Sequence, residues 1–175
     1  KQKTAYEIRP RDWSSDVCSS DLVIRAARLG AQLALAIIGG DPARFAPFAE
    51  LYYQALSEFG KDPLPISIHS PGHLAETDEE ALEQLWPHYQ TMFGRIGRER
   101  GWSPMSKDHY LNEAKFGSLY VGGPETVAQK IARAIKVVGA TRFDFKYVNG
   151  PIPQEQLLKS LELYGTKVIP RVREL

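Results

Sequence analysis

Apolar positions after residue 22 follow two kinds of pattern, one typical of helices and one typical of buried strands. Val23–Leu29 places apolar side chains on one helical face and is followed by glycine, so it is predicted to be the end of a helix. Leu33–Ile38 is a continuous apolar run closed by Gly39 and Gly40, which indicates a strand buried on both faces. Two more strands are predicted at Pro65–His69 and Arg142–Val148.

Helix start and stop signals separate these strands. An aspartate cap followed by proline opens a predicted helix at Asp41–Phe59, and a Thr-x-x-Glu capping box opens another at Thr77–Arg100. A Gly-Gly-Pro start precedes a helix that continues to Val138, and a last helix is expected from about Gln154 to Arg173. Gly101–Tyr120 shows no regular period and is predicted to be irregular.

The alternation of strands and helices predicts an α/β fold with parallel pairing through right-handed crossovers. Three strands cannot close a barrel, so they form either an open sheet or the last third of an eight-stranded one. In both folds, active and binding sites lie at the carboxyl ends of the strands. Those ends are Ile38–Asp41, His69–His73 and Tyr147–Pro151.

Composition excludes several classes of partner. The chain has 22 basic and 21 acidic residues, a net charge of +1, so no one-signed field favours nucleic acid or an anionic membrane. A small-molecule partner fits better. No run approaches the about 20 apolar residues that cross a bilayer, and the single cysteine, Cys18, permits no internal disulfide. These features favour a cytoplasmic location.

The first 22 residues differ from the rest of the chain. Lys1–Leu22 shows neither a helical nor a strand period and contains Ser-Ser-Asp twice. It resembles the in-frame translation of a sequencing adapter, with KQKTAYEI and DWSSDVCSSDL as constant arms around a short variable spacer. We therefore expect residues 1–22 to be a non-native, disordered tail and residues 23–175 to be the domain. A disordered natural tail is the alternative.

Several stretches after the tail carry a family resemblance. They are RAARLG, LALAIIGGDPARFAPF, ISIHSPGHLAETDEEALEQLWPHY, SLYVGGPETVAQKIARAI, RFDFKYVNGPIP and SLELYGTKVIP. In this order and spacing they resemble the C-terminal part of luciferase-like flavin-dependent monooxygenases, over essentially all of Val23–Leu175. The resemblance implies about the last three strand-helix units of a (β/α)8 TIM barrel. It also implies reduced FMN, or a deazaflavin, at the top face, where flavin and O2 oxidise a small organic substrate.

The same resemblance implies what the chain lacks. The first five or so strands, the catalytic residues and the main flavin-phosphate site of the family would all precede Val23. We therefore assign no catalytic residue and expect this fragment to be inactive alone, and poorly soluble because strand edges stay unpaired. A flavin-reducing partner and a homodimeric parent are compatible with the family. The alternatives are a deazaflavin-dependent dehydrogenase, a non-catalytic α/β module, or a subunit that completes a barrel with a partner.

Four residues at the first two strand ends are candidate cofactor contacts. Gly39 and Gly40 lack side chains, which would let a planar ring system approach the backbone, although a plain strand-to-helix turn explains them equally well. His69 and Ser70 end the second strand. The imidazole of His69 could hydrogen-bond flavin or substrate, and a structural histidine is the competing interpretation.

Four residues at the third strand end are candidate substrate contacts. Alternation places Lys146 and Tyr147 on opposite sides of the strand, and Asn149 and Gly150 form the following loop. No metal site is predicted, because the pair His69 and His73 is interrupted by proline and glycine and does not share a helical face.

Overall fold

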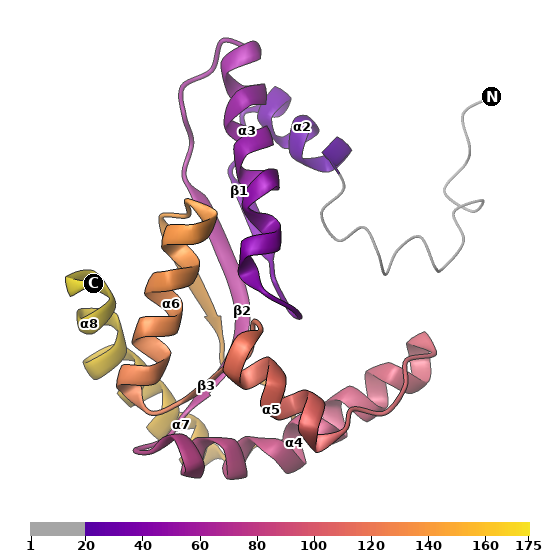
Figure 1. The fold of residues 1–175 in the computed structure, drawn as a ribbon, viewed down its shortest axis with the longest axis vertical. Helices are drawn as coiled ribbons and strands as arrows, with labels where there is room; N and C mark the ends of the chain where they lie inside the picture. Colours follow the sequence, from indigo (N-terminus) through magenta and orange to yellow (C-terminus); the bar gives the residue numbers. More distant parts are fainter. Residues whose placement is uncertain (1–19) are drawn as a thin grey trace.

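The protein is described by a computed structural model that covers residues 20–175 (Figure 1). Residues 1–19 of the predicted tail lie outside the described residues. Ser20–Leu22, the rest of that tail, form the first turn of helix α2, which begins three residues before the predicted boundary at Val23. No helix in the described part of the chain is both long and apolar enough to cross a membrane.

Strands and helices alternate along the described chain, as the α/β prediction requires. The strands are β1 (Leu33–Ala36), β2 (Ile66–Leu74), β3 (Tyr120–Gly122) and β4 (Arg142–Lys146). The helices are α2 (Ser20–Leu29), α3 (Ala46–Glu58), α4 (Asp78–Arg100), α5 (Lys107–Phe116), α6 (Pro124–Val138), α7 (Gln154–Leu163) and α8 (Ile169–Glu174). A short 3-10 helix, Pro42–Phe45, precedes α3, and a π-helical turn, Tyr164–Val168, joins α7 to α8.

Strand β2 is the centre of the sheet, and every pairing it makes is parallel. Its residues Ile66–His69 pair with β1, and Ser67–Pro71 pair with β4. Because these two stretches overlap, β1 and β4 must lie on opposite edges of β2. The carboxyl end of β2, Gly72–Leu74, pairs with the short β3. Parallel pairing brings the carboxyl ends of β1, β2 and β4 to one edge of the sheet.

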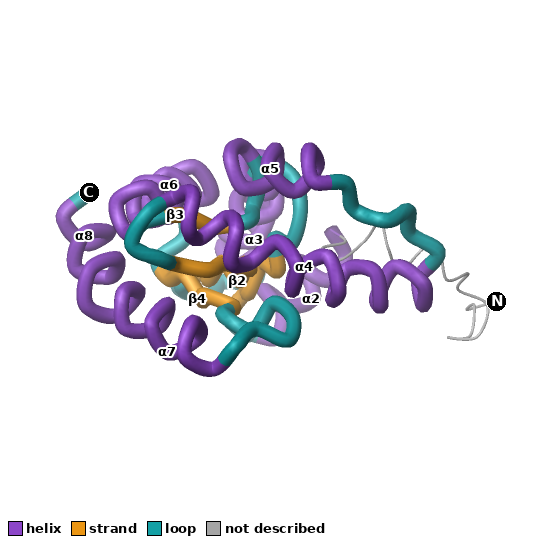
Figure 2. The backbone as a smooth tube through the Cα atoms, turned by 90° about the horizontal axis from the view of Figure 1, so that it is seen from below, coloured by secondary structure: helices purple, strands orange, loops and turns teal. Residues whose placement is uncertain are grey.

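Two hydrophobic clusters stabilise this arrangement. The larger lies between one face of the sheet and the helix layer, and it includes the buried side chains Leu35, Ile37, Tyr52, Ile66, Ile68, Ile131 and Val168. The smaller joins α4 and α5 to β3 and includes Leu85, Tyr89, Tyr110, Leu119 and Val121. Helices α4 and α5 lie together in both views, and α4 extends away from the strands (Figures 1 and 2).

The prediction of an irregular segment at Gly101–Tyr120 holds for residues 101–106 and 117–119 and is wrong between them and at Tyr120. Lys107–Phe116 is helix α5, capped by the Ser106 hydroxyl, which accepts a hydrogen bond from the His109 N–H at 3.1 Å. Strand β3 follows at once from Tyr120. Helix α5 is mostly polar and its amphipathic pattern is weak, so only its tertiary contacts fix it as a helix.

The strand bounds also shift, because pairing partners decide where a strand ends. β1 ends at Ala36 rather than Ile38, since its last paired residue faces His69 of β2. β2 continues to Leu74, five residues beyond the predicted end, because β3 and β4 supply partners there. The cap at Asp41 and the threonine cap of α4 are confirmed: Asp41 Oδ1 accepts from the Ala43 N–H, and Thr77 Oγ1 from the Glu80 N–H.

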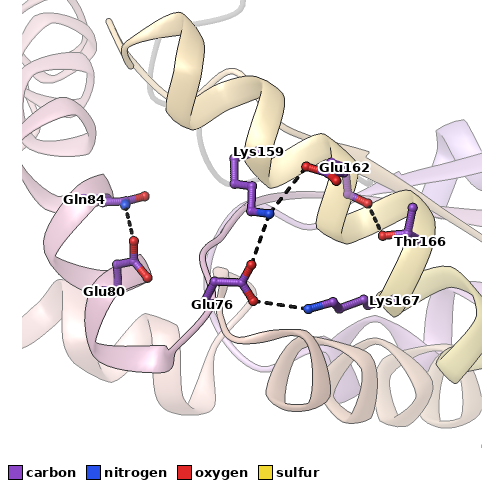
Figure 3. Close-up of polar contacts among 7 residues, drawn as sticks. All are labelled: Glu76, Glu80, Gln84, Lys159, Glu162, Thr166 and Lys167. Carbon is purple, nitrogen blue, oxygen red and sulfur yellow. Dashed lines mark hydrogen bonds and ion pairs between the residues drawn. The ribbon is translucent and has the colours of Figure 1, made fainter.

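A charged cluster connects the loop after β2 to the C-terminal helices. The Glu76 carboxylate lies 3.1 Å from Lys159 Nζ and 3.2 Å from Lys167 Nζ (Figure 3). These two ammonium groups hold the pKa of Glu76 below its ordinary value. All three side chains are exposed, so the contribution of this cluster to the stability of the fold is small.

Candidate functional site

One face of the sheet is packed against helices, and the opposite face carries polar side chains. Phe143 and Phe145 of β4 pack against the larger core, with the Phe145 ring stacked on Tyr164 at 4.4 Å between centroids. Alternation therefore turns Asp144 and Lys146 to the opposite face. We call this second side of the sheet the open face.

The register between β2 and β4 places His69 on the open face as well. Ile66 and Ile68 are core residues, so Ser67 and His69 point to the open face, and His69 pairs directly with Asp144. Lys146 lies one step further along β4 on the same face. His69 and Lys146 are both half-buried, and the ring of His69 makes no hydrogen bond to any described residue. Two sequence-predicted site residues thus lie together.

Lys146 is positioned by Asn149. Its Nζ donates to Asn149 Oδ1 at 3.3 Å, and the Asn149 amide nitrogen donates to the carbonyl oxygens of Gly72 (2.8 Å) and Lys146 (2.9 Å). Asn149 is fully buried and fastens the loop after β4 to the end of β2. Burial lowers the pKa of Lys146, and the described residues offer its ammonium no carboxylate partner. A half-buried, unpaired cation favours an anionic or electron-rich ligand.

The Gly39-Gly40 loop is only partly available to a ligand. Gly40 has φ +77°, which favours glycine, and its N–H donates to the Glu113 carboxylate of α5 at 3.0 Å. At Gly39 the space that a side chain would occupy is free of other heavy atoms to 4 Å. Among these two glycines, Gly39 is therefore the one that a ligand ring could approach.

Of the remaining predicted site residues, Ser70 and Gly150 have structural contacts in the described chain and Tyr147 has none. Ser70 is fully buried, and its hydroxyl donates to the Ile37 carbonyl at 2.7 Å, so it ties β2 to the chain beyond β1. Gly150 has φ +124° and lies so close to the His88 carbonyl that a side chain has no space. Tyr147 is 41% exposed at the end of β4 and lies free on the surface.

An internal carboxylate occupies the N-terminus of α6. Asp78 Oδ1 accepts a hydrogen bond from the Gly123 N–H at 2.6 Å, and Asp78 Oδ2 accepts from the Thr126 hydroxyl at 2.9 Å. A carboxylate at a helix N-terminus satisfies the same backbone donors that a phosphate would use. This helix start is therefore a link between α4 and α6.

His73 is a buried histidine whose burial the local sequence pattern does not indicate. Its side chain is completely buried, and Nε2 lies 2.9 Å from Gln84 Oε1. The Gln84 amide nitrogen donates to Glu80 (Figure 3). In this orientation Gln84 Oε1 is the acceptor and His73 Nε2 carries the proton. Nδ1 of His73 has no partner. Burial is the main cause of its lowered pKa, and His88 lowers it further.

Acid is expected to destabilise the fold through His73. The unfolded chain binds a proton at this residue near pH 6.5, and the folded chain binds it only at lower pH, so stability is complete above pH 6.5 and falls as the pH drops below it. Urea unfolding at pH values from 7 to about 5 measures the loss. His73→Gln should flatten the slope in this range. The matched substitution His109→Gln, at an exposed histidine, should leave it unchanged, and an equal slope for H73Q and the wild type would contradict the assignment.

No metal-binding site is evident in the described part of the chain. Residues 20–175 bring together no group of three or more histidine, cysteine, aspartate or glutamate side chains that could hold a metal ion.

Comparisons with known proteins identify the architecture. No protein-family description matches the chain, and no curated protein resembles it in sequence. Among solved structures, monooxygenase RslO1 from Streptomyces bottropensis matches 87% of this chain and 45% of its own, at 21% identity and a TM-score of 0.67. The fold is that of part of a TIM barrel. The chain spans less than half of this relative's length.

Two further relatives extend the comparison to different cofactors. The oxygenating constituent of 3,6-diketocamphane monooxygenase from Pseudomonas putida, solved with FMN, has 18% identity and a TM-score of 0.62 over 86% of this chain and 45% of its own. The coenzyme F420 dependent tetrahydromethanopterin reductase from Methanopyrus kandleri has 17% identity and a TM-score of 0.57 over 88% of this chain and 49% of its own. At these identities the similarity establishes the fold and leaves the chemistry to the site.

Proposed function

We propose that residues 23–175 are the C-terminal part of a luciferase-like flavin-dependent oxidoreductase, in which reduced FMN and O2 oxidise a small organic substrate. The observation that carries this proposal is the open face, where Lys146, the last residue of β4, and His69, level with the last residue of β1, lie on the same side of parallel strands. Active sites of TIM barrels lie at the carboxyl ends of the strands. The relative solved with FMN shares the fold.

The residues present fit a reduced flavin. A reduced flavin carries negative charge on its pyrimidine ring, and Lys146 supplies an unpaired, half-buried cation held in place by Asn149. His69 would hydrogen-bond the ring or the substrate, and Gly39 leaves space for a ring edge. A deazaflavin is the second candidate cofactor, because two structural relatives are described as F420-dependent. The flavin supplies the redox chemistry, and these residues bind and orient it.

Sequencing the gene from which this chain comes tests whether residues 23–175 are part of a longer enzyme. We expect sequencing across the junction of Leu22 and Val23 to show an upstream reading frame with about five more strand-helix units. A native start near Val23 would instead favour a non-catalytic module or a subunit completed by a partner. We also propose that the fragment is inactive alone and that the protein is cytoplasmic. We propose further that a partner protein reduces its flavin and that the intact parent is a homodimer.

The role of Lys146 is tested by cofactor binding to the intact gene product. Lys146→Gln is expected to weaken binding of reduced FMN at least about tenfold, because the neutral amide cannot offset the charge of the ring. Lys136→Gln removes the same charge from the exposed surface of α6 and should leave affinity within about twofold. Anaerobic titration followed by flavin absorbance measures both. Equal affinities for these two variants would exclude a flavin contact for Lys146.

A further inference from the structure

A small cavity outside the open face is surrounded by positive charge. It lies between the 3-10 helix after β1, the carboxyl end of α5 and the middle of α6, and it has a volume of about 40 Å³. Lys115, Lys130 and Arg133 line it, and Asp41 is the one acidic residue in its lining. None of these residues belongs to the proposed flavin site.

Lys130 is a half-buried cation in the lining of this cavity. Its Nζ donates to the carbonyl oxygens of Glu113 (3.2 Å), Ala114 (2.5 Å) and Leu119 (2.8 Å) and lies 5.2 Å from the centroid of the Tyr120 ring. All three N–H groups are therefore in use, so Lys130 supplies charge rather than free donors. Burial lowers its pKa to about 8. An anion in the cavity would favour its charged form.

Lys115 and Arg133 supply the free donors. Both side chains are exposed, and within residues 20–175 neither forms an ion pair. The nearby acids are engaged with the backbone: Asp41 accepts from the Ala43 N–H, and Glu113 accepts from the Gly40 N–H. Three cations thus face a cavity with one acid, and two of them have unused hydrogen-bond donors.

We propose that this cavity binds a phosphate group, with Lys115 and Arg133 as hydrogen-bond donors and the ammonium of Lys130 as a nearby positive charge. The guanidinium of Arg133 matches two phosphate oxygens at once. The volume admits about three waters or one tetrahedral oxyanion, and it is too small for a ring system. The ligand is therefore free phosphate or the phosphate of a monoester whose organic part stays in solvent. This site does not depend on the proposed flavin chemistry.

The test is a titration of the 175-residue chain with inorganic phosphate and, separately, with glycerol 3-phosphate. Backbone amide NMR shifts or thermal unfolding are followed at constant ionic strength, with chloride as the reference anion. Binding of both compounds identifies a phosphomonoester site, and binding of inorganic phosphate alone identifies a free-anion site. No response beyond that to chloride overturns the proposal.

Matched variants locate the bound anion. Arg133→Gln and Lys115→Gln are each expected to raise the dissociation constant for inorganic phosphate at least about fivefold, because each removes a charged donor. Lys136→Gln, on the same helix as Arg133 but outside the cavity lining, removes the same charge and should change it less than about twofold. Equal weakening by R133Q and K136Q would show a diffuse surface effect and overturn the site. All three residues are exposed, so these variants are expected to fold.

Discussion

Gly72→Ala is expected to destabilise the protein by about 3 kcal/mol, a large fraction of the about 5 to 15 kcal/mol that keeps an ordinary domain folded. A Cβ at this position would overlap the ring of Phe145 and lie 2.5 Å from the carbonyl oxygen of Tyr120. The Phe145 ring cannot move away freely, because it is stacked on Tyr164. The carbonyl belongs to β3, which pairs with β2 at Gly72 itself.

Urea unfolding followed by circular dichroism measures this effect. Gly94→Ala is the matched control, since Gly94 lies inside helix α4 with no heavy atom within 4 Å of the added methyl group. That substitution should stabilise the protein by about 0.5 to 1 kcal/mol, because alanine is the better helix former. If both variants unfolded at the same urea concentration, the close packing between β2, β3 and β4 would be wrong.

Tyr110→Ala is expected to destabilise the packing of α5 by about 4 kcal/mol, within the range for loss of a large buried aromatic side chain. The Tyr110 ring is fully buried and packs 5.0 Å from Trp86 and 5.8 Å from Tyr89, measured between ring centroids. Its hydroxyl donates to the Leu82 carbonyl at 3.0 Å. This one side chain therefore joins α5 to three residues of α4.

Hydrogen exchange distinguishes a local from a global loss. We expect Y110A to increase exchange first in α5 and β3, because the smaller hydrophobic cluster is separate from the larger one under the sheet. Tyr110→Phe keeps the ring and removes only the hydroxyl, so it should cost about 1 kcal/mol. Equal losses of stability for Y110A and Y110F would show that the hydrogen bond, rather than the ring, holds α5 in place.

The helices and the alternation of layers could be predicted from local patterns, because capping residues and apolar periods act within a few positions. Helix α5 could not. Its polar sequence buries chiefly Tyr110, and one aromatic side chain gives no period. The cap at Ser106 was the available signal, but it lacks the glutamate that completes a capping box. Strand β3 has three residues, which is too short for any pattern to stand out.

Lys146 and His69 could be named as candidates from the sequence, but their common position on the open face could not. Alternation along one strand predicts that Lys146 and Tyr147 point to opposite sides, and the sequence supplies no more than that. The neighbourhood of Lys146 and His69 depends on the register between β2 and β4, which lie 75 residues apart at the pair Ser67 and Arg142. Likewise, nothing in the sequence links Glu113 to Gly40 or places Lys130 in the lining of a cavity, because both contacts depend on where α5 packs.

The central position of β2 has a consequence for synthesis on the ribosome. β2 can pair with β1 as soon as both have emerged, but its other edge waits for β4, whose last residue comes 72 positions after Leu74. At about 5 to 20 residues per second this interval lasts roughly 4 to 14 seconds. During that time an unpaired strand edge is exposed to other nascent chains. Slow translation between residues 74 and 146 should therefore increase co-translational aggregation of this protein.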